Sequence, residues 1–324
     1  MTIKLTFGVS ESDRMGPLVD GTVPIEGVEA TWNVHGVQAL FNKQLSDHAY
    51  DACEFPLGTY LRDMEGARRY LAVPVFPSRH FRLSCVFTHR DAGITKPADL
   101  AGKRIGIPVW DMAAAVWLRG MFQDYYDLPR TAPIYVTNGL EEARTGDEHP
   151  QVYPDGFQIE HSHAEGGLAG MLARGEIDAL YTARAPSTYV EGGSVTRLFD
   201  DPMAADMAYY EMTGIYPPMH VLCVKREIAA ANPGLTRALF DAFTKAQEEA
   251  RARLYDSAAL SVMLPWALEH LTMTERKLGK DYWSTGLARN RDTLDTIIRY
   301  TREDGLIEGA FSAADLFDTD MADT

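Results

Sequence analysis

The chain has 324 residues, enough for one large domain or two lobes with a substantial hydrophobic core. Apolar residues make up 46% of the sequence and aromatic residues 10%, which excludes an intrinsically disordered chain. The formal net charge of -15 argues against binding of nucleic acid or of an anionic membrane, although a local group of arginines can still bind a small anion.

The amino terminus alternates apolar and polar side chains, so we expect a strand over residues 3–9 and a glycine-containing loop over residues 10–17. The sequence has no secretory signal pattern. It also has no stretch long and apolar enough to cross a membrane. We therefore expect a cytoplasmic protein without a membrane partner.

Strand-like and helix-like segments then alternate, as is typical of an α/β fold. In the first part we expect strands over residues 28–34 and 49–54, with helices over residues 37–46 and 57–64. An apolar run over residues 70–76 leads to a polar stretch, and a further strand is expected over residues 83–87.

The second part repeats this alternation. A turn with a short helix is expected at residues 96–102, and strands are expected at residues 103–108, 134–136 and 175–181, with helices at 112–126 and 168–174. A weak repeat, Asp51-Ala52 and Asp178-Ala179, favours two similar lobes. Residues 221–224 are expected to return the chain to the first lobe as a strand, before helices over residues 234–254, 256–271 and 292–304.

These elements predict two lobes. Lobe 1 is expected to contain residues 1–80 and 222–324, and lobe 2 residues 81–221. Two crossovers are expected to join them, near residues 79–82 and 216–220.

Arg79, His80 and Arg82 lie within four residues, between two apolar runs. Guanidinium groups bind carboxylates in forked pairs, and histidine transfers protons near neutral pH. The stretch therefore suits an anionic substrate whose turnover moves a proton, although a solvated loop is the alternative interpretation. In an extended chain a spacing of three residues puts Arg79 and Arg82 on opposite faces, so we favour Arg79 as the ligand.

Cys53, Cys85 and Cys223 are odd in number and lie in or beside apolar runs, so we expect buried, reduced thiols. The sequence has no CxxC motif or His/Cys cluster. His161 and His163 come closest to a metal pair, but solvated side chains are the preferred interpretation. We expect neither a metal nor another cofactor.

Residues 96–106 (KPADLAGKRIG) resemble a turn of type-2 periplasmic-binding-protein folds. More narrowly, the chain resembles the 4,5-dihydroxyphthalate decarboxylase family. The segments that carry this resemblance span nearly the whole chain: residues 74–79 (PVFPSR), 112–121 (MAAAVWLRGM), 138–142 (NGLEE), 183–187 (ARAPS), 213–220 (TGIYPPMH) and 262–266 (VMLPW).

The resemblance implies an α/β fold of two lobes with an interlobe cleft, where ligands meet the carboxyl ends of strands and the N-termini of helices. The implied reaction is cofactor-independent decarboxylation of 4,5-dihydroxyphthalate, a small anionic aromatic substrate, to protocatechuate. Such a site needs arginines for the carboxylates and a group that transfers a proton to the ring. The sequence leaves open whether the chain forms a homo-oligomer.

Three residues are candidates for proton transfer. His220 follows two prolines at the second crossover, and His80 competes with it beside two arginines. Either histidine has a purely structural role as its alternative. Glu54 ends a short buried strand and is a candidate general base or arginine partner.

The candidate substrate-binding residues lie in the segments expected to converge on the cleft. Arg184 is a candidate ligand, with an interlobe salt bridge as the alternative. Trp110 is a candidate stacking partner for an aromatic ring, with core packing as the alternative. The full set is Arg14, Arg79, Arg82, Trp110, Arg184 and Ser187.

Two functions remain in competition. One is a decarboxylase, and the other is a non-catalytic protein that binds a small anion for transport or sensing. The fold alone does not choose between them. The lack of a secretory signal favours the enzyme, because an extracytoplasmic binding protein must be exported.

Overall fold

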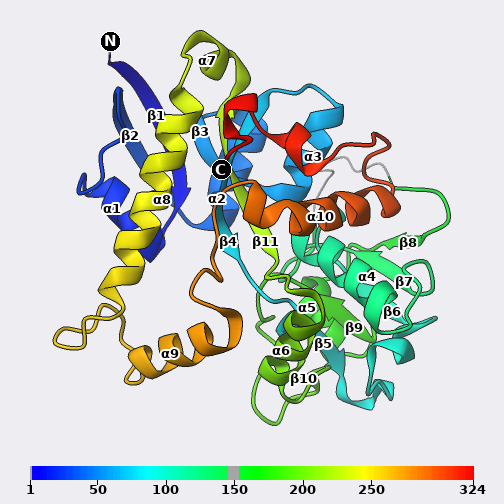
Figure 1. The fold of residues 1–324 in the computed structure, drawn as a ribbon. Coiled ribbons are helices and arrows are strands. Elements are labelled where there is room, and N and C mark those ends of the chain that lie inside the picture. The colour runs from blue at the N-terminus through cyan, green and yellow to red at the C-terminus, as the bar shows by residue number, and fades with distance from the viewer. Residues whose placement is uncertain (1, 145–152) are drawn as a thin grey trace. The chain divides into compact units, whose positions relative to one another are not determined.

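The structure is a computed structural model, and it describes residues 2–144 and 153–324. The chain divides into two compact units, each with its own sheet. Unit 1 contains Met1–Arg79, Pro218–Asp295 and Ala310–Thr324. Unit 2 contains His80–Pro217 and Thr296–Gly309. Figure 1 labels the elements of both units.

The sheet of unit 1 has five strands in the order β2-β1-β3-β11-β4. β1 runs parallel to β2 and β3, whereas β11 runs antiparallel to β3 and β4. The first residues of β11 therefore lie at the edge where β1, β3 and β4 end. The strands are β1 (Ile3–Ser10), β2 (Val28–His35), β3 (Ala52–Pro56), β4 (Tyr70–Arg79) and β11 (Pro218–Lys225).

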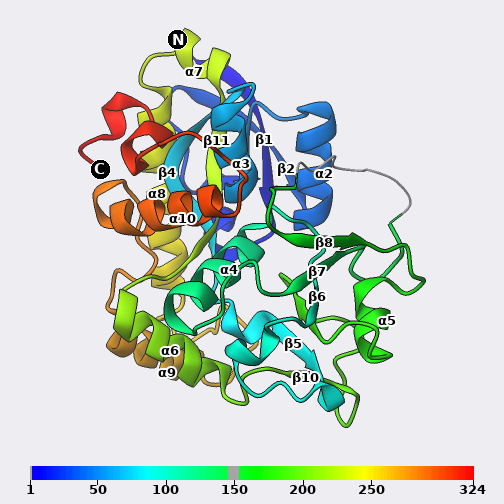
Figure 2. The ribbon, with the colours of Figure 1, turned by 90° about the vertical axis from the view of Figure 1, so that its right-hand side faces the viewer.

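Helices cover both faces of this sheet. Figure 2 shows α8 (Leu235–Arg253) and α2 (Val37–Asp47) on opposite sides of it. Under α8 the core includes Phe7, Leu222 and Phe243, all almost inaccessible to water. Such burial is the main force that holds helix and sheet together. The remaining helices that begin in unit 1 are α1 (Gly16–Val19), α3 (Leu57–Glu65), α7 (Arg226–Ala231), α9 (Ala267–Leu278) and α10 (Arg291–Glu303).

The sheet of unit 2 has six strands in the order β10-β5-β9-β6-β7-β8. Its strands are β5 (Val86–His89), β6 (Arg104–Gly106), β7 (Ile134–Thr137), β8 (Gln158–His161), β9 (Ala179–Tyr181) and β10 (Val195–Arg197). Its helices are α4 (Ala113–Tyr125), α5 (Gly167–Ala173) and α6 (Pro202–Thr213). A core that includes Phe87, Val136 and Leu180 packs against α5.

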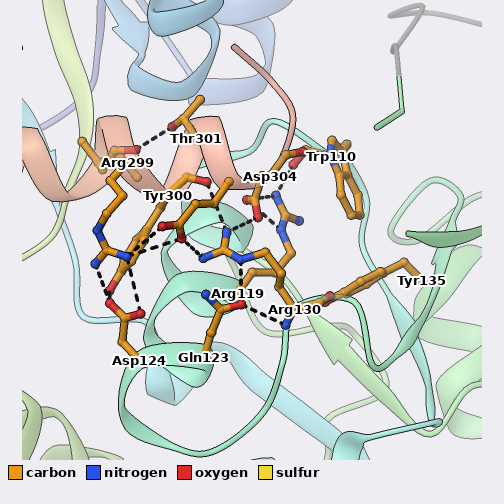
Figure 3. Close-up of polar contacts among 12 residues, drawn as sticks. Trp110, Arg119, Gln123, Asp124, Arg130, Tyr135, Arg299, Tyr300, Thr301 and Asp304 are labelled. Carbon is orange, nitrogen blue, oxygen red and sulfur yellow. Dashed lines mark hydrogen bonds and ion pairs between the residues drawn. The ribbon is translucent and has the colours of Figure 1, made fainter. Parts of the chain in front are cut away.

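A short C-terminal segment, Thr296–Gly309, belongs to unit 2, although the sequence placed it in lobe 1. Its Asp304 is inaccessible to water and accepts from Arg130 Nη1 at 2.6 Å and from Arg119 Nε at 2.8 Å (Figure 3). Tyr300 also packs edge-on against Trp117 with ring centres 5.6 Å apart. The chain therefore passes between the units at four points, after residues 79, 217, 295 and 309.

Most expected elements are present, with ends shifted by a few residues. The strand expected over residues 49–54 occupies Ala52–Pro56, and the one expected over residues 83–87 begins only at Val86. A single 3-10 turn at Leu83–Cys85 precedes Val86, because Cys85 N donates to the Arg82 carbonyl. The α6, α7, β8 and β10 segments were not expected as separate elements.

The helix expected over residues 256–271 is wrong in its first part. The chain is irregular to Trp266, and α9 begins at Ala267. Asp256 accepts a hydrogen bond from the Ala258 backbone N–H, which competes with helix formation. Pro265 also disfavours the helical conformation at the residue before it.

The three cysteines are free and buried, which confirms the expectation. Across residues 2–144 and 153–324, no group of three or more His, Cys, Asp or Glu side chains is arranged to hold a metal. In the same residues, no helix is both long and apolar enough to cross a membrane.

Candidate active site

Three polar side chains come together at the end of the unit 1 sheet where strands β1, β3 and β4 terminate. Ser10 is the last residue of β1, Glu54 lies in β3, and His220 lies near the start of β11. Because β11 runs against β3, His220 pairs with Pro56 and Leu222 pairs with Glu54. This register places residues 166 positions apart in direct contact.

Glu54 is almost fully buried, with only 1% of its surface exposed. His220 Nδ1 lies 2.5 Å from Glu54 Oε1. Ser10 donates two hydrogen bonds to the other oxygen, Oε2, from its Oγ at 2.5 Å and from its backbone N at 2.9 Å. Both carboxylate oxygens are thus hydrogen-bonded, as a buried charge requires.

Two opposing effects set the pKa of Glu54. Burial acts to raise the pKa, because it penalises the charged form. The hydrogen bond and charge of His220 and the hydrogen bonds from Ser10 act against it, and the pKa ends below its ordinary value. Glu54 is therefore an anion that accepts hydrogen bonds at neutral pH.

His220 is the partly open member of the pair, with 15% of its side chain exposed. Phe41 packs edge-on against its ring, with centroids 4.8 Å apart and planes at 85°. Since Nδ1 is occupied by Glu54, Nε2 is the ring atom left to contact a ligand. No residue in the described part of the chain forms a hydrogen bond with that nitrogen.

Arg79 is the last residue of β4, and Arg14, in the 3-10 turn after β1, contacts this end of β4; both belong to unit 1. Arg79 is buried and donates to the Ser284 carbonyl at 2.9 Å and to Asn290 Oδ1. Arg14 is half-buried, lies over the Trp283 ring at 4.6 Å, and donates to the Pro77 carbonyl. In this structure Arg79 is engaged with the C-terminal part of unit 1, and Arg14 is the more open of the two.

His80 and Arg82 belong to unit 2, whereas Glu54 and His220 belong to unit 1. Arg82 is buried and donates to the Ala183 carbonyl at 3.0 Å. His80 is exposed, and its Nδ1 contacts the Phe81 carbonyl. Although part of its surface is exposed, neighbouring protein atoms partly desolvate the His80 ring. This desolvation is the larger cause, and the charge of Arg82 the smaller one, of a pKa of His80 below its ordinary value.

The remaining candidate ligands also lie in unit 2. Arg184 is exposed, and its side chain forms no ion pair or hydrogen bond with the residues that the structure describes. Ser187 is exposed and donates to Glu141 through both N and Oγ, at 3.1 and 2.5 Å. Trp110 is fully buried, with the Arg119 guanidinium 4.0 Å from its ring centre. That position matches the core-packing alternative.

The two histidines that came closest to a metal pair have other partners. His161 Nδ1 lies 2.7 Å from Thr137 Oγ1, and His163 Nδ1 lies 3.0 Å from the Arg144 carbonyl. These contacts give both rings local structural roles.

Sequence reasoning named Glu54 and His220 but not two residues that contact them, Ser10 and Phe41. Ser10 carried a usable signal, because it is a polar residue that directly follows the strand expected over residues 3–9, at the carboxyl end of that strand. Phe41 carried none, since an apolar residue of an amphipathic helix is ordinarily assigned to the core.

The fold places the chain among periplasmic-binding-protein-like proteins. Its structure resembles a putative sulfonate ABC transporter's periplasmic sulfonate-binding protein from Methylobacillus flagellatus, with 11% identity, a TM-score of 0.52, and coverage of 99% of this chain and 93% of that one. It also resembles the desulfurization enzyme DSZB, with 17% identity, a TM-score of 0.53, and coverage of 99% and 97%. At such low identities these similarities establish the fold alone, and this confirms the expected fold class.

Sequence comparison identifies the family. The chain is 35% identical over 317 residues to a 4,5-dihydroxyphthalate decarboxylase of Comamonas testosteroni, which covers 97% of this chain and 96% of the relative. It is also 35% identical over 210 residues to the enzyme of that name from Pseudomonas putida, which covers 64% of this chain and 81% of the relative. No family model matches. The chain belongs to the 4,5-dihydroxyphthalate decarboxylase family and is a carboxy-lyase.

Proposed function

We propose that this protein decarboxylates 4,5-dihydroxyphthalate to protocatechuate and that the Glu54–His220 pair performs the proton transfer. The substrate is taken from the names of the two relatives. The observation that carries the mechanism is the hydrogen bond of 2.5 Å between His220 and a buried, ionised Glu54. That the active site lies in a cleft between the lobes remains a prediction.

The reaction exchanges a carboxylate for a proton on one ring carbon. The hydroxyl para to the leaving carboxylate loses its proton and pushes electrons into the ring, and the carbon that bears the carboxylate is protonated. The bond from that carbon to the carboxylate then breaks, its electron pair restores aromaticity, CO2 leaves, and the resulting phenoxide regains its proton from water. One proton is consumed for each CO2 released, so the proton donor must be recharged from water.

His220 is the proposed proton donor, through Nε2. Glu54 accepts from Nδ1, which fixes the orientation of the ring and leaves Nε2 for the substrate. Because its pKa is lowered, Glu54 is assigned this orienting role and not that of the acid. Ser10 is a positioning residue, since it holds the second oxygen of Glu54.

Arginines are proposed to bind the substrate carboxylates. Arg184 is exposed, and its side chain has no ion pair or hydrogen bond among the described residues, whereas Arg14 is half-buried near the ends of β1 and β4 and pairs with Asp13 at 2.9 Å. Both remain candidates on these grounds. Arg79 and Arg82 are buried and donate to other protein groups, and Trp110 is enclosed in a core, so we give them no direct contact in this proposal.

The test is incubation of the purified protein with 4,5-dihydroxyphthalate, with measurement of CO2 and protocatechuate. We expect both products in equal amounts, without added metal or cofactor. Tight binding of the substrate with no CO2 would contradict the enzymatic proposal and favour the alternative, a non-catalytic protein for a small anionic ligand.

A further inference from the structure

A basic hollow lies on unit 1, at the end of the sheet where β4 begins and β11 ends. Its volume is about 630 Å³. Four permanently charged cations and one carboxylate line it, together with His48, Tyr70 and Ala230: Arg68, Arg69, Lys225, Arg226 and Glu227. The lining therefore has a net positive charge, although the whole chain carries -15.

The contacts of these cations leave two arginines available. Arg226 donates to the carbonyls of Arg68 and Tyr70, both at 2.9 Å, and so builds the wall of the hollow. Lys225 lies 3.5 Å from Asp51 Oδ1. Arg68 and Arg69 are exposed, and neither forms an ion pair within 4.0 Å in the part of the chain that the structure describes. These two guanidiniums carry the charge at this site that no ion pair within 4.0 Å neutralises, although Arg68 interacts electrostatically with Asp315.

Hydrogen bonds among neighbouring side chains also hold Arg69 in place. Its Nη1 lies 2.8 Å from His48 Nε2, and His48 Nδ1 lies 2.8 Å from the Tyr70 hydroxyl. Gln44 Nε2 donates to the same hydroxyl at 3.0 Å from the buried side of α2. A chain of hydrogen bonds thus orients one face of the hollow, which reduces the entropy lost when a ligand binds.

The backbone of the hollow is unusual as well. His48 and Arg68 have positive φ angles of 49° and 50°, and only one other non-glycine residue in the described ranges does so. Such conformations cost energy and tend to occur at functional sites. Here they bring two separate turns, after α2 and after α3, to the same hollow.

The hollow is distinct from the Glu54–His220 pair. His220 is near the start of β11, and Lys225 is its last residue. Five residues of extended chain, at about 3.3 Å each, place His220 roughly 16 Å from Lys225. Neither His220 nor the buried Glu54 lines the hollow.

We propose that this hollow is a second binding site, for a small oxyanion with two negative charges. Two arginine forks match the geometry of phosphate and of a dicarboxylate, and each contact would be charge-assisted. The shared chemistry has two sources, free phosphate and an aromatic dicarboxylate of the substrate class. The site does not depend on the proposed reaction.

The experiment is calorimetric titration with inorganic phosphate and, separately, with phthalate, which lacks the hydroxyls needed for turnover. The test variant is Arg68→Gln/Arg69→Gln. The matched control is Arg276→Gln/Lys277→Gln, which removes two adjacent exposed charges from α9 of the same unit. His220→Ala separates the hollow from the catalytic pair, and thermal melting checks that every variant folds.

We expect the test variant to bind at least one of the two anions about tenfold more weakly, as loss of charge-assisted hydrogen bonds implies. The control and His220→Ala should bind it as the native protein does, and added salt should weaken the native affinity. The anion whose affinity falls identifies the source. Equal affinity of the test variant and its control for both anions, or no binding to the native protein, overturns the proposal.

Discussion

Two buried carboxylates, Glu54 in unit 1 and Asp304 in unit 2, have opposite surroundings. Both are almost inaccessible to water, and both have each oxygen hydrogen-bonded. Asp304 is neutralised by two arginines, which remain charged at any physiological pH. Glu54 is paired with a histidine that is partly exposed and able to gain or lose a proton. Burial is therefore common to both carboxylates, and the titratable, accessible partner is what distinguishes the one proposed for the active site.

The largest expected effect concerns the accessible partner. His220→Ala should lower kcat by about 10²- to 10⁴-fold, the usual contribution of a general acid. Substrate affinity measured directly should stay within a few-fold. Steady-state kinetics with calorimetric binding checks both.

His80→Ala is the matched control for this change. If His220 is the proton donor, replacement of His80, whose Nδ1 contacts the Phe81 carbonyl, should leave kcat nearly unchanged. A slow His80→Ala variant beside a fully active His220→Ala variant would show that the other histidine transfers the proton.

Asp304→Asn tests the structural member of the comparison. Removal of this charge leaves Arg119 and Arg130 buried without their shared anion, so stability should fall by about 3–5 kcal/mol. Urea unfolding measures the loss. Asp241→Asn, which breaks an exposed pair with Arg237, should cost about 1 kcal/mol or less. Equal losses in the two variants would contradict the assigned role of Asp304.

A third acid, Asp206, sharpens the comparison because it has no cationic partner among the described residues. Burial raises its pKa from 3.8 to about 7, against a hydrogen bond from the Leu83 backbone. Its folded-state pKa lies above the unfolded value, so its contribution to stability is complete below about pH 4 and is lost as pH rises through about 7.

The slope of this effect is about 1.4 kcal/mol per pH unit between the two values. The stability advantage of the native protein over Asp206→Asn should therefore shrink from pH 5 to pH 7. Urea unfolding at both pH values measures it, and a constant difference would refute the assignment.

The smallest expected effect comes from Ser10. Ser10→Ala removes one of the hydrogen bonds that lower the pKa of Glu54, so that pKa should rise. We expect kcat to fall about tenfold, since a hydrogen bond to a charged group is lost. The acid limb of the pH profile should also move to higher pH. Ser10→Thr keeps a hydroxyl and should restore most of the activity, whereas an unchanged pH profile in Ser10→Ala would deny Ser10 its positioning role.

The sequence predicted the class of fold, and it nominated Glu54 and His220, which the structure brings into contact. Strand periodicity placed Glu54 at the carboxyl end of its expected strand, where α/β sheets hold ligands, and placed His220 just before the strand expected over residues 221–224. The pairing itself was not predictable, because 166 residues separate the partners and only the register of β11 brings them together.

The same reason explains why Thr296–Gly309 was assigned to the wrong lobe. Local periodicity shows that α10 is a helix but does not show what it packs against. Its position in unit 2 depends on contacts of Asp304 with Arg119 and Arg130, which lie 185 and 174 residues away. A pairing of that kind leaves no pattern in the neighbouring sequence.

The central claim is that His220, oriented by Glu54, delivers a proton to the ring carbon that loses CO2. Turnover of 4,5-dihydroxyphthalate in D2O tests it most directly, with native protein and His220→Ala compared by mass spectrometry and NMR. We predict protocatechuate with one deuterium at the former carboxylate position from the native protein, and formation at least about 10²-fold slower from the variant. Unaltered substrate with the native protein, or equal rates from both proteins, would contradict the account.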